Sequence, residues 1–122
     1  MSGESIPIVV VSLRPFLRVA KAIGLTDAEI QEIEVQVAYD PEQGDLVEGT
    51  GGVRKRRVAL SNRNKGKSGG GRVFTVFFHM DMPVYIVAMV DKSDAGNLSK
   101  AERNELAKLT GQLKAAQERK RK

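Results

Sequence analysis

Residues 53–90 read VRKRRVALSNRNKGKSGGGRVFTVFFHMDMPVYIVAMV, and they hold most of the strand-forming sequence of the chain. Three segments, Val53–Leu60, Arg72–Met80 and Val84–Val90, have the apolar, β-branched and aromatic residues typical of strands. A polar, glycine-rich connection joins the first two segments, and a tight turn joins the last two. Because consecutive strands usually lie side by side, these residues predict an antiparallel sheet.

Helical patterns precede this region. Ile6–Val11 predicts a first strand, and Pro15 then opens a helix that ends at Gly24. A second helix follows directly, because Thr26–Glu29 is a capping box and the apolar pattern continues until Asp40–Pro41. The two helices are expected to form a hairpin.

A third helix is expected at the C-terminal end. Leu98–Glu102 contains a second capping box, and Leu106, Leu109 and Leu113 form an apolar stripe. Residues 113–122 are basic and are expected to fray. The predicted order is strand, two helices, three strands and a helix, which is an α+β fold with a small antiparallel sheet packed against helices.

Composition limits the possible functions. With 122 residues the chain is expected to form a single domain over residues 1–122. It has no Cys and one His, so neither a disulfide framework nor a thiolate or histidine-rich metal site is expected, and no cofactor is predicted. The N-terminal apolar segment is too short to span a membrane, and a cytoplasmic protein is expected.

Charge is separated along the chain. Residues 26–48 contain eight Asp or Glu and no Lys or Arg, whereas residues 53–72 contain eight Lys or Arg and no Asp or Glu. The net charge of +5 therefore understates the positive electrostatic potential expected around residues 53–72. Glycines within and around the basic segment let a backbone approach a ligand closely, so the composition favours binding of phosphate groups.

The basic strand predicts a shared cationic surface. Side chains alternate between faces along a strand, so Lys55 and Arg57 point one way and Arg54 and Arg56 point the other. Lys55 and Arg57 are then about 6–7 Å apart. If this strand pairs antiparallel with the next, Arg72 lies near the far end of the ladder, where the glycine-rich loop closes over it. We expect a concave patch that holds a phosphate under the glycine-rich loop Gly66–Gly71.

These residues also match two other interpretations, a solvated or edge-protecting strand and a nucleotide-binding loop. A basic strand is often only a solvated surface or a protected sheet edge. A nucleotide-binding phosphate loop needs G-x-x-x-x-G-K-[ST] before a helix, but Ser61 occupies the first glycine position and a strand follows Gly69–Gly71. An ATPase or GTPase is therefore excluded. Among the aromatic residues, Phe77 is the best candidate for stacking on a base, because its face of the strand is less apolar.

The combined motifs resemble the HigB branch of the RelE superfamily, toxins of type II toxin–antitoxin systems. The resemblance rests on Gly49–Arg57, Gly66–Val73, the strand that ends at Asp91–Lys92, and the helix start at Leu98–Glu102. It implies a compact α+β domain that enters the ribosomal A site and cuts mRNA. It also implies neutralisation by a small antitoxin, often one with a helix-turn-helix part.

The resemblance assigns roles to individual residues. Lys55, Arg57 and Arg72 correspond to the family's basic catalytic positions. Of the residues expected to contact RNA, Lys67 and Lys92 follow from the resemblance, and Arg54, Lys65 and Phe77 from the basic segment and the strand pattern. The family commonly has a Tyr two residues before the Lys92 position, where this chain has Val90.

The expected chemistry is metal-independent endoribonucleolytic cleavage. A ribose 2′-hydroxyl attacks its own 3′-phosphate, and arginines stabilise the charge on phosphorus. Lys55 either shares that role or acts as a general base, because neighbouring positive charges favour neutral lysine. Two alternatives remain open: a catalytically silent family member that binds RNA or the ribosome, and an unrelated nucleic-acid-binding module.

Overall fold

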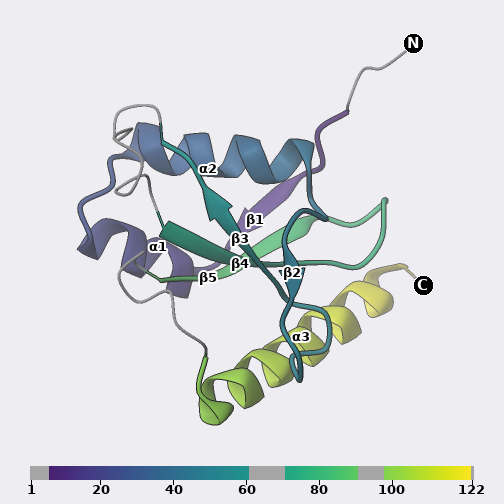
Figure 1. Ribbon diagram of the computed structural model, residues 1–122. Coiled ribbons are helices and arrows are strands. Elements are labelled where there is room, and N and C mark those ends of the chain that lie inside the picture. Colours follow the sequence, from purple (N-terminus) through teal and green to yellow (C-terminus); the bar gives the residue numbers. More distant parts are fainter. Residues whose placement is uncertain (1–5, 61–70, 91–97, 122) are drawn as a thin grey trace.

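The protein is described here by a computed structural model, which covers residues 6–60, 71–90 and 98–121. Its helices and strands confirm an α+β fold (Figure 1). In chain order they are β1 (Val10–Ser12), α1 (Arg14–Ala22), α2 (Asp27–Tyr39), β2 (Asp45–Leu46), β3 (Arg54–Val58), β4 (Gly71–Phe77), β5 (Val84–Val90) and α3 (Lys100–Arg121).

The five strands form one sheet in the order β1-β5-β4-β3-β2. The β2–β3, β3–β4 and β4–β5 pairs are antiparallel, as predicted, but β1 pairs with β5 in parallel. The prediction of an entirely antiparallel sheet is therefore wrong at this edge. Two helices separate β1 from the other strands, so no tight turn fixes its direction. The prediction also missed β2, whose two residues lie in a segment expected to be a loop.

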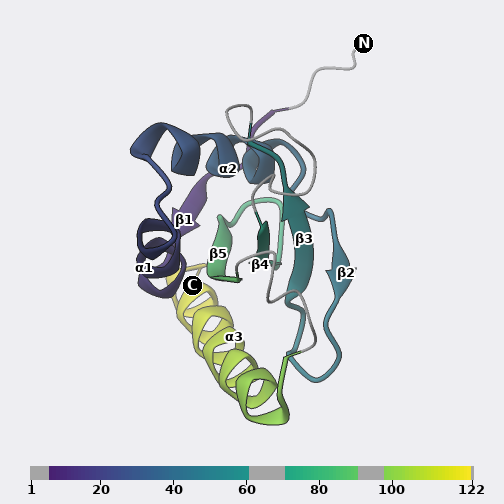
Figure 2. The same cartoon turned by 60° about the vertical axis from the view of Figure 1, so that its left-hand side comes forward.

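The helices cover opposite faces of the sheet. Figures 1 and 2 show α1 and α2 on one side and α3 on the other. The α1 and α2 side has a core in which Phe16, Ile33 and Val37 are fully buried against Val73 and Ile86 of the sheet. The α3 side has a second core around Phe74, Val76 and Val87.

Local signals explain where α1 and α2 begin and end. Pro15 lies in the first turn of α1, and Gly24 follows the helix with a positive φ of 92° that suits glycine. The Thr26 hydroxyl accepts a hydrogen bond from the Glu29 N–H at 3.1 Å, and the Glu29 carboxylate accepts one from the Thr26 N–H at 2.9 Å. This reciprocal pair is the predicted capping box.

The third helix begins at its predicted cap and is longer than expected. The Ser99 hydroxyl accepts from the Glu102 N–H at 3.1 Å. The C-terminal segment, expected to fray, is helical as far as Arg121. The side-chain amide of Gln117 donates a hydrogen bond to the Tyr85 hydroxyl of β5, which fastens this end of α3 to the sheet. No helix in the described part of the chain is both long and apolar enough to cross a membrane.

Candidate functional site

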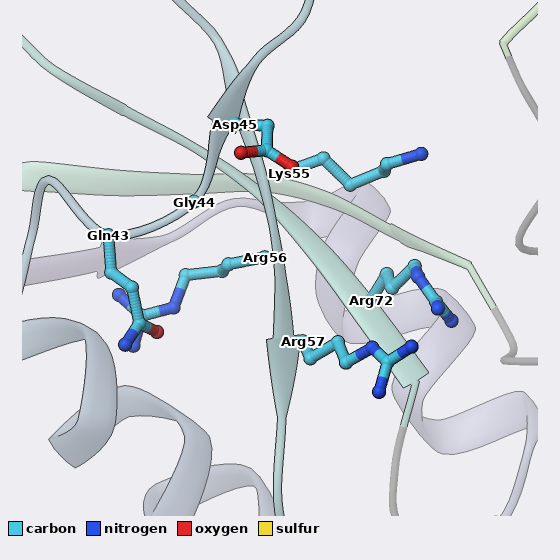
Figure 3. A pocket seen from close by; sticks show the side chains of 7 residues that line it. All are labelled: Gln43, Gly44, Asp45, Lys55, Arg56, Arg57 and Arg72. Carbon is cyan, nitrogen blue, oxygen red and sulfur yellow. The ribbon is translucent and has the colours of Figure 1, made fainter.

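The pairing of β3 with β4 brings together three predicted site residues. Arg57 is directly opposite Arg72 in the ladder, and Lys55 is two residues earlier on β3, opposite Phe74. Figure 3 shows Lys55, Arg57 and Arg72 extending from the same side of the sheet, which is the side of α3. We call these three residues the cationic cluster. The predicted alternation of side chains along β3 is confirmed.

The cationic cluster borders a hollow of about 650 Å³, which we call the cationic hollow (Figure 3). Its lining residues are Gln43, Gly44, Asp45, Lys55, Arg56, Arg57 and Arg72. The hollow exists because β2 pairs only with Arg54 and Lys55, so the second half of β3 has no neighbouring strand on that side. The outer edge of β3 is therefore open beside Arg57.

Gly44 shapes one wall of the cationic hollow. Its φ is +114°, and a Cβ atom placed there would lie 2.7 Å from the carbonyl oxygen of Lys55. Only glycine allows the chain to pass this close to β3 before β2 begins. Sequence reasoning missed Gln43, Gly44 and Asp45 as site residues. The Gln-Gly-Asp turn was the available signal, but it lay in a segment interpreted only as a loop.

The cationic cluster is only partly balanced by described residues, because Asp45, directly opposite Lys55 across β2 and β3, is the one described carboxylate that lines the hollow. Arg57 is exposed, Lys55 and Arg72 are half-buried, and none of the three forms an ion pair with a described residue. Like charges directly opposite each other on neighbouring strands are destabilising. The pairing of Arg57 with Arg72 therefore costs stability unless an anion lies between them, and this makes the hollow suited to a phosphate group.

Arg56 has a different, structural role. It is only 5% exposed, and its guanidinium donates hydrogen bonds to the carbonyl oxygens of Asp40 at 2.6 Å and Gln36 at 3.4 Å. A cation is stabilising at the C-terminal end of a helix, here α2. Burial lowers the pKa of Arg56 from its ordinary value, and the nearby Asp40 carboxylate opposes this change. Arg56 therefore ties β3 to α2.

Two of the predicted RNA-binding residues, Arg54 and Phe77, do not join the cationic cluster. Arg54 donates to the carbonyl oxygen of Gly44 at 2.9 Å, and its place in the strand alternation puts it on the α2 side with Arg56. Phe77 packs against the α1 and α2 core, on the opposite face of the sheet. This partial burial against the helices argues against the predicted stacking of Phe77 on a base.

Three predicted residues lie outside the described part of the chain. These are Lys65 and Lys67 of the glycine-rich connection, and Lys92 after β5. The predicted loop Gly66–Gly71 also lies outside it, except for Gly71 at the start of β4. The roles of these residues stay predictions.

The glycines at positions 49–52 have a structural explanation that sequence reasoning did not find. Gly49, Gly51 and Gly52 all have positive φ, in the turn that connects β2 to β3. A Cβ atom on Gly51 would lie 3.5 Å from the methyl group of Thr110 in α3. The buried Thr50 hydroxyl donates to the Val47 carbonyl and accepts from the Val53 N–H. These glycines thus form a tight hairpin against α3 and do not line the cationic hollow.

Val90 adjoins the cationic cluster. It pairs directly with Arg72 across β4 and β5, so Arg57, Arg72 and Val90 form one row across three strands. The tyrosine that the resemblance implies would stand at this point. The described residues therefore supply positive charge at the site without an aromatic hydroxyl at this position.

The arrangement can hold an anion and stabilise developing negative charge. Two guanidinium groups and an ammonium group extend on the same side of two adjacent strands, with Arg57 and Arg72 paired directly and Lys55 two residues away on β3. In the described segments, no group of three His, Asp or Glu side chains is placed to bind a metal ion. The chemistry that these described residues offer is therefore cationic stabilisation of a phosphoryl group.

A protein-family model matches most of the chain. The model of a family described as RelE toxin of the RelE / RelB toxin-antitoxin system matches residues 9–122. The match includes every strand and helix of the structure. Members of this family are generally mRNA-cleaving toxins, paired with an antitoxin. With an α+β fold, a cationic hollow on the sheet and a match over nearly its whole length, the chain belongs to the RelE toxin family.

Proposed function

We propose that this protein is an endoribonuclease that cuts ribosome-bound mRNA without a metal ion and is neutralised by a cognate antitoxin. The observation that supports this most directly is the pairing of Arg57 with Arg72, with Lys55 on the same face. This arrangement costs folding stability and has no structural use in the described residues. Binding of a phosphodiester accounts for it.

The proposed reaction is an internal phosphoryl transfer. The ribose 2′ oxygen loses its proton and bonds to the phosphorus of its own 3′ linkage. The bond from phosphorus to the 5′ oxygen of the next nucleotide breaks, and that oxygen takes up a proton. The products are a 2′,3′-cyclic phosphate and a 5′-hydroxyl. Arg57 and Arg72 stabilise the additional negative charge on the phosphate oxygens, because each guanidinium presents a planar pair of donors.

Lys55 has two possible tasks in this reaction. As a cation it adds to the charge stabilisation, and as a neutral amine it takes the proton from the 2′-hydroxyl. The cationic cluster by itself offers little acid–base chemistry, since arginine does not give up its proton in proteins. Such an enzyme depends on the ribosome to orient the 2′-hydroxyl for attack, which is a proximity effect.

Inducible expression with mapping of mRNA ends tests the proposal. The wild-type protein is expected to arrest growth and to produce new 5′ ends within translated reading frames, with 5′-hydroxyl groups. Arg72→Ala is expected to lower the cleavage rate about 100-fold or more, the usual cost of removing one stabilising donor. Purified ribosomes with a defined mRNA then show whether cleavage needs the ribosome.

Arg18→Ala is the matched control. Arg18 is exposed on α1, on the other side of the sheet, so this variant removes the same charge without touching the cationic hollow. It is expected to cleave as the wild type does. Equal activity of wild type and a folded Arg72→Ala variant would overturn the proposed catalytic site.

The presence of valine at position 90, where the family commonly has tyrosine, favours a second function. A family member without the tyrosine beside Arg72 could bind RNA or the ribosome and not cut. The two functions are separated by ribosome co-sedimentation together with cleavage: binding with intact mRNA supports the silent member.

The substitution Val90→Tyr sharpens this distinction. Directly paired side chains on antiparallel strands have Cβ atoms about 4.5–5.5 Å apart, so the new phenol would stand beside Arg72. If the wild type cleaves weakly because it lacks a stacking or proton-transferring group here, Val90→Tyr raises the cleavage rate several-fold. Val90→Phe separates stacking from proton transfer. An unchanged rate in both variants would show that position 90 does not limit the reaction.

The antitoxin partner follows from family membership, and its type is part of the proposal. We expect a small protein with a helix-turn-helix domain, as the HigB branch implies. The neighbouring reading frame is the first place to look for it. Co-expression of that frame is expected to restore growth; failure to do so, with the toxin still active, would contradict this pairing.

A further inference from the structure

The cationic hollow contains one side chain that is ready to accept a proton at neutral pH. The reaction proposed above needs such a group, because the 2′-hydroxyl must lose its proton. Guanidinium groups do not give up their protons, and an ammonium group accepts none until it has lost one. A carboxylate is ordinarily ionised at neutral pH and accepts a proton directly. Among the described residues that line the cationic hollow, Asp45 carries the one carboxylate.

Asp45 lies next to the cationic cluster. It begins β2 and is directly opposite Lys55 in the β2–β3 ladder. Side chains paired in this way leave the sheet on the same face, with Cβ atoms about 4.5–5.5 Å apart. Figure 3 shows the Asp45 carboxylate beside the first carbons of the Lys55 side chain, while the Lys55 ammonium group extends away from it.

The Asp45 carboxylate is exposed, and it forms no ion pair or hydrogen bond with any residue that the structure describes. Lys55, although directly opposite, likewise has no ion pair with a described residue. If these two residues served only to hold β2 against β3, their charged groups would be expected to meet. Both groups instead stay available to a ligand in the hollow.

The backbone around Asp45 is held by contacts that do not use its carboxylate. Arg54 donates to the carbonyl oxygen of Gly44, the preceding residue, at 2.9 Å. Two residues later, the Val47 N–H donates to the Val53 carbonyl oxygen at 2.8 Å. Asp45 is therefore fixed on both sides while its side chain is left for another task, which is the arrangement that a reacting group needs.

We propose that Asp45 is the general base of the cleavage reaction, an inference that rests on the proposed function. A carboxylate oxygen of Asp45 takes the proton of the 2′-hydroxyl as the 2′ oxygen bonds to phosphorus. The bond from phosphorus to the 5′ oxygen breaks, and that oxygen takes a proton from water. The hydroxide so formed is neutralised by the proton that Asp45 then releases. Lys55 keeps its proton and acts as a cation beside Arg57 and Arg72.

The negative charge of Asp45 separates this role from a purely electrostatic one. The charged residues that line a hollow together with Asp45 are Lys55, Arg56, Arg57, Arg72, Arg103 and Glu48. Most of them are cations, so Asp45→Asn leaves a more positive hollow that attracts phosphate more strongly. If charge were the only effect of Asp45, this variant would cleave faster. Loss of a general base instead lowers the rate, typically by about 10²–10⁴-fold.

Single-turnover cleavage of a defined mRNA on purified ribosomes, measured across a range of pH, tests the inference. Asp45→Asn is expected to cleave at least about 100-fold more slowly than the wild type. Its affinity for a 2′-O-methyl version of the mRNA, which cannot undergo the attack, should be equal or higher. The wild-type rate should fall at low pH, where a carboxylate is protonated, and Asp45→Asn should lack this fall. Asp45→Glu keeps the carboxylate and should recover part of the rate.

Glu42→Gln is the matched control. Glu42 is an exposed carboxylate in the same acidic segment and does not line the cationic hollow. This variant should match the wild type in rate and in pH dependence. Because Asp45 is exposed, Asp45→Asn should fold as the wild type does, and urea unfolding checks this.

A substrate with sulfur in place of the 5′ oxygen distinguishes a general base from a general acid. A thiolate leaves without taking a proton, so the slow cleavage by Asp45→Asn should persist on this substrate. Recovery of the wild-type rate there would assign Asp45 to the leaving group and overturn the inference. Cleavage of ordinary mRNA by Asp45→Asn at the wild-type rate or faster would also overturn it, and the proposed nuclease would stand. Intact mRNA with the wild type would refute both.

Discussion

On the side of the sheet covered by α1 and α2, side chains such as Phe16, Ile33 and Val37 are fully buried, whereas on the other side the leucines of α3 are only partly buried. Thr110 is the one α3 residue with a described side chain that is buried. The cationic cluster lies on this second side, and the cationic hollow opens at the outer edge of β3. The first face thus supplies most of the packing energy, and the second keeps charge and space available for a ligand.

Shortening a buried side chain on the face covered by α1 and α2 should have the largest effect on stability. Phe16→Ala removes a fully buried ring and is expected to lower the free energy of unfolding by about 3–5 kcal/mol. Urea unfolding followed by circular dichroism measures this. The matched control is Val9→Ala, since Val9 is 70% exposed and its loss should cost no more than about 0.5 kcal/mol.

Loss of the Arg56 hydrogen bonds that link β3 to α2 should have the next largest effect on the free energy of unfolding. Arg56→Ala removes charged hydrogen bonds to the carbonyls of Asp40 and Gln36 and is expected to cost about 2 kcal/mol. Arg57→Ala, at the exposed neighbouring position, serves as the control and should be nearly neutral in the same unfolding measurement. Equal stability of the two variants would show that Arg56 is not a structural tie.

Shortening a side chain on the α3 face should lower the free energy of unfolding by less than shortening one on the α1 and α2 face. Leu109→Ala removes a partly buried side chain and is expected to lower the free energy of unfolding by about 1–2 kcal/mol. A loss of 3 kcal/mol or more, of the size expected for a fully buried leucine, would mean that α3 packs as firmly as α1. The difference between the two faces would then not hold.

The smallest effect on stability is expected within the cationic cluster. Arg72→Ala ends the repulsion from Arg57, so the free energy of unfolding should stay within about 0.5 kcal/mol of the wild type. The same variant should have the largest effect on cleavage. A strongly destabilised Arg72→Ala protein would instead assign Arg72 a packing role.

Much of this fold could be predicted from local sequence signals. The capping box at Thr26–Glu29, the glycine after α1 and the three segments of β3, β4 and β5 were each encoded by neighbouring residues. The shared face of Lys55, Arg57 and Arg72 also followed, because strand alternation and antiparallel pairing are short-range rules.

Features that depend on distant contacts could not be predicted. The sequence does not reveal that Phe77 faces a helix layer, because β4 lies in the middle of the sheet and is covered on both sides, so the polarity of its neighbours is no guide. The glycines of the β2–β3 turn likewise match two explanations, close approach to a ligand or a positive φ. The positive φ values of Gly49, Gly51 and Gly52, which only the folded structure reveals, identify the second explanation.

The position of β5 has a consequence for how this protein is made. β5 is the last of the described strands in chain order, yet it lies between β4 and β1, and the pairing of Val10 with Val84 joins residues 74 positions apart. The first strand has no partner in the sheet until the last one has left the ribosome. Such long-range pairing slows folding, so synthesis must be nearly finished before the sheet can close. A truncated product that ends before residue 84 would lack the strand that joins β1 to the rest of the sheet.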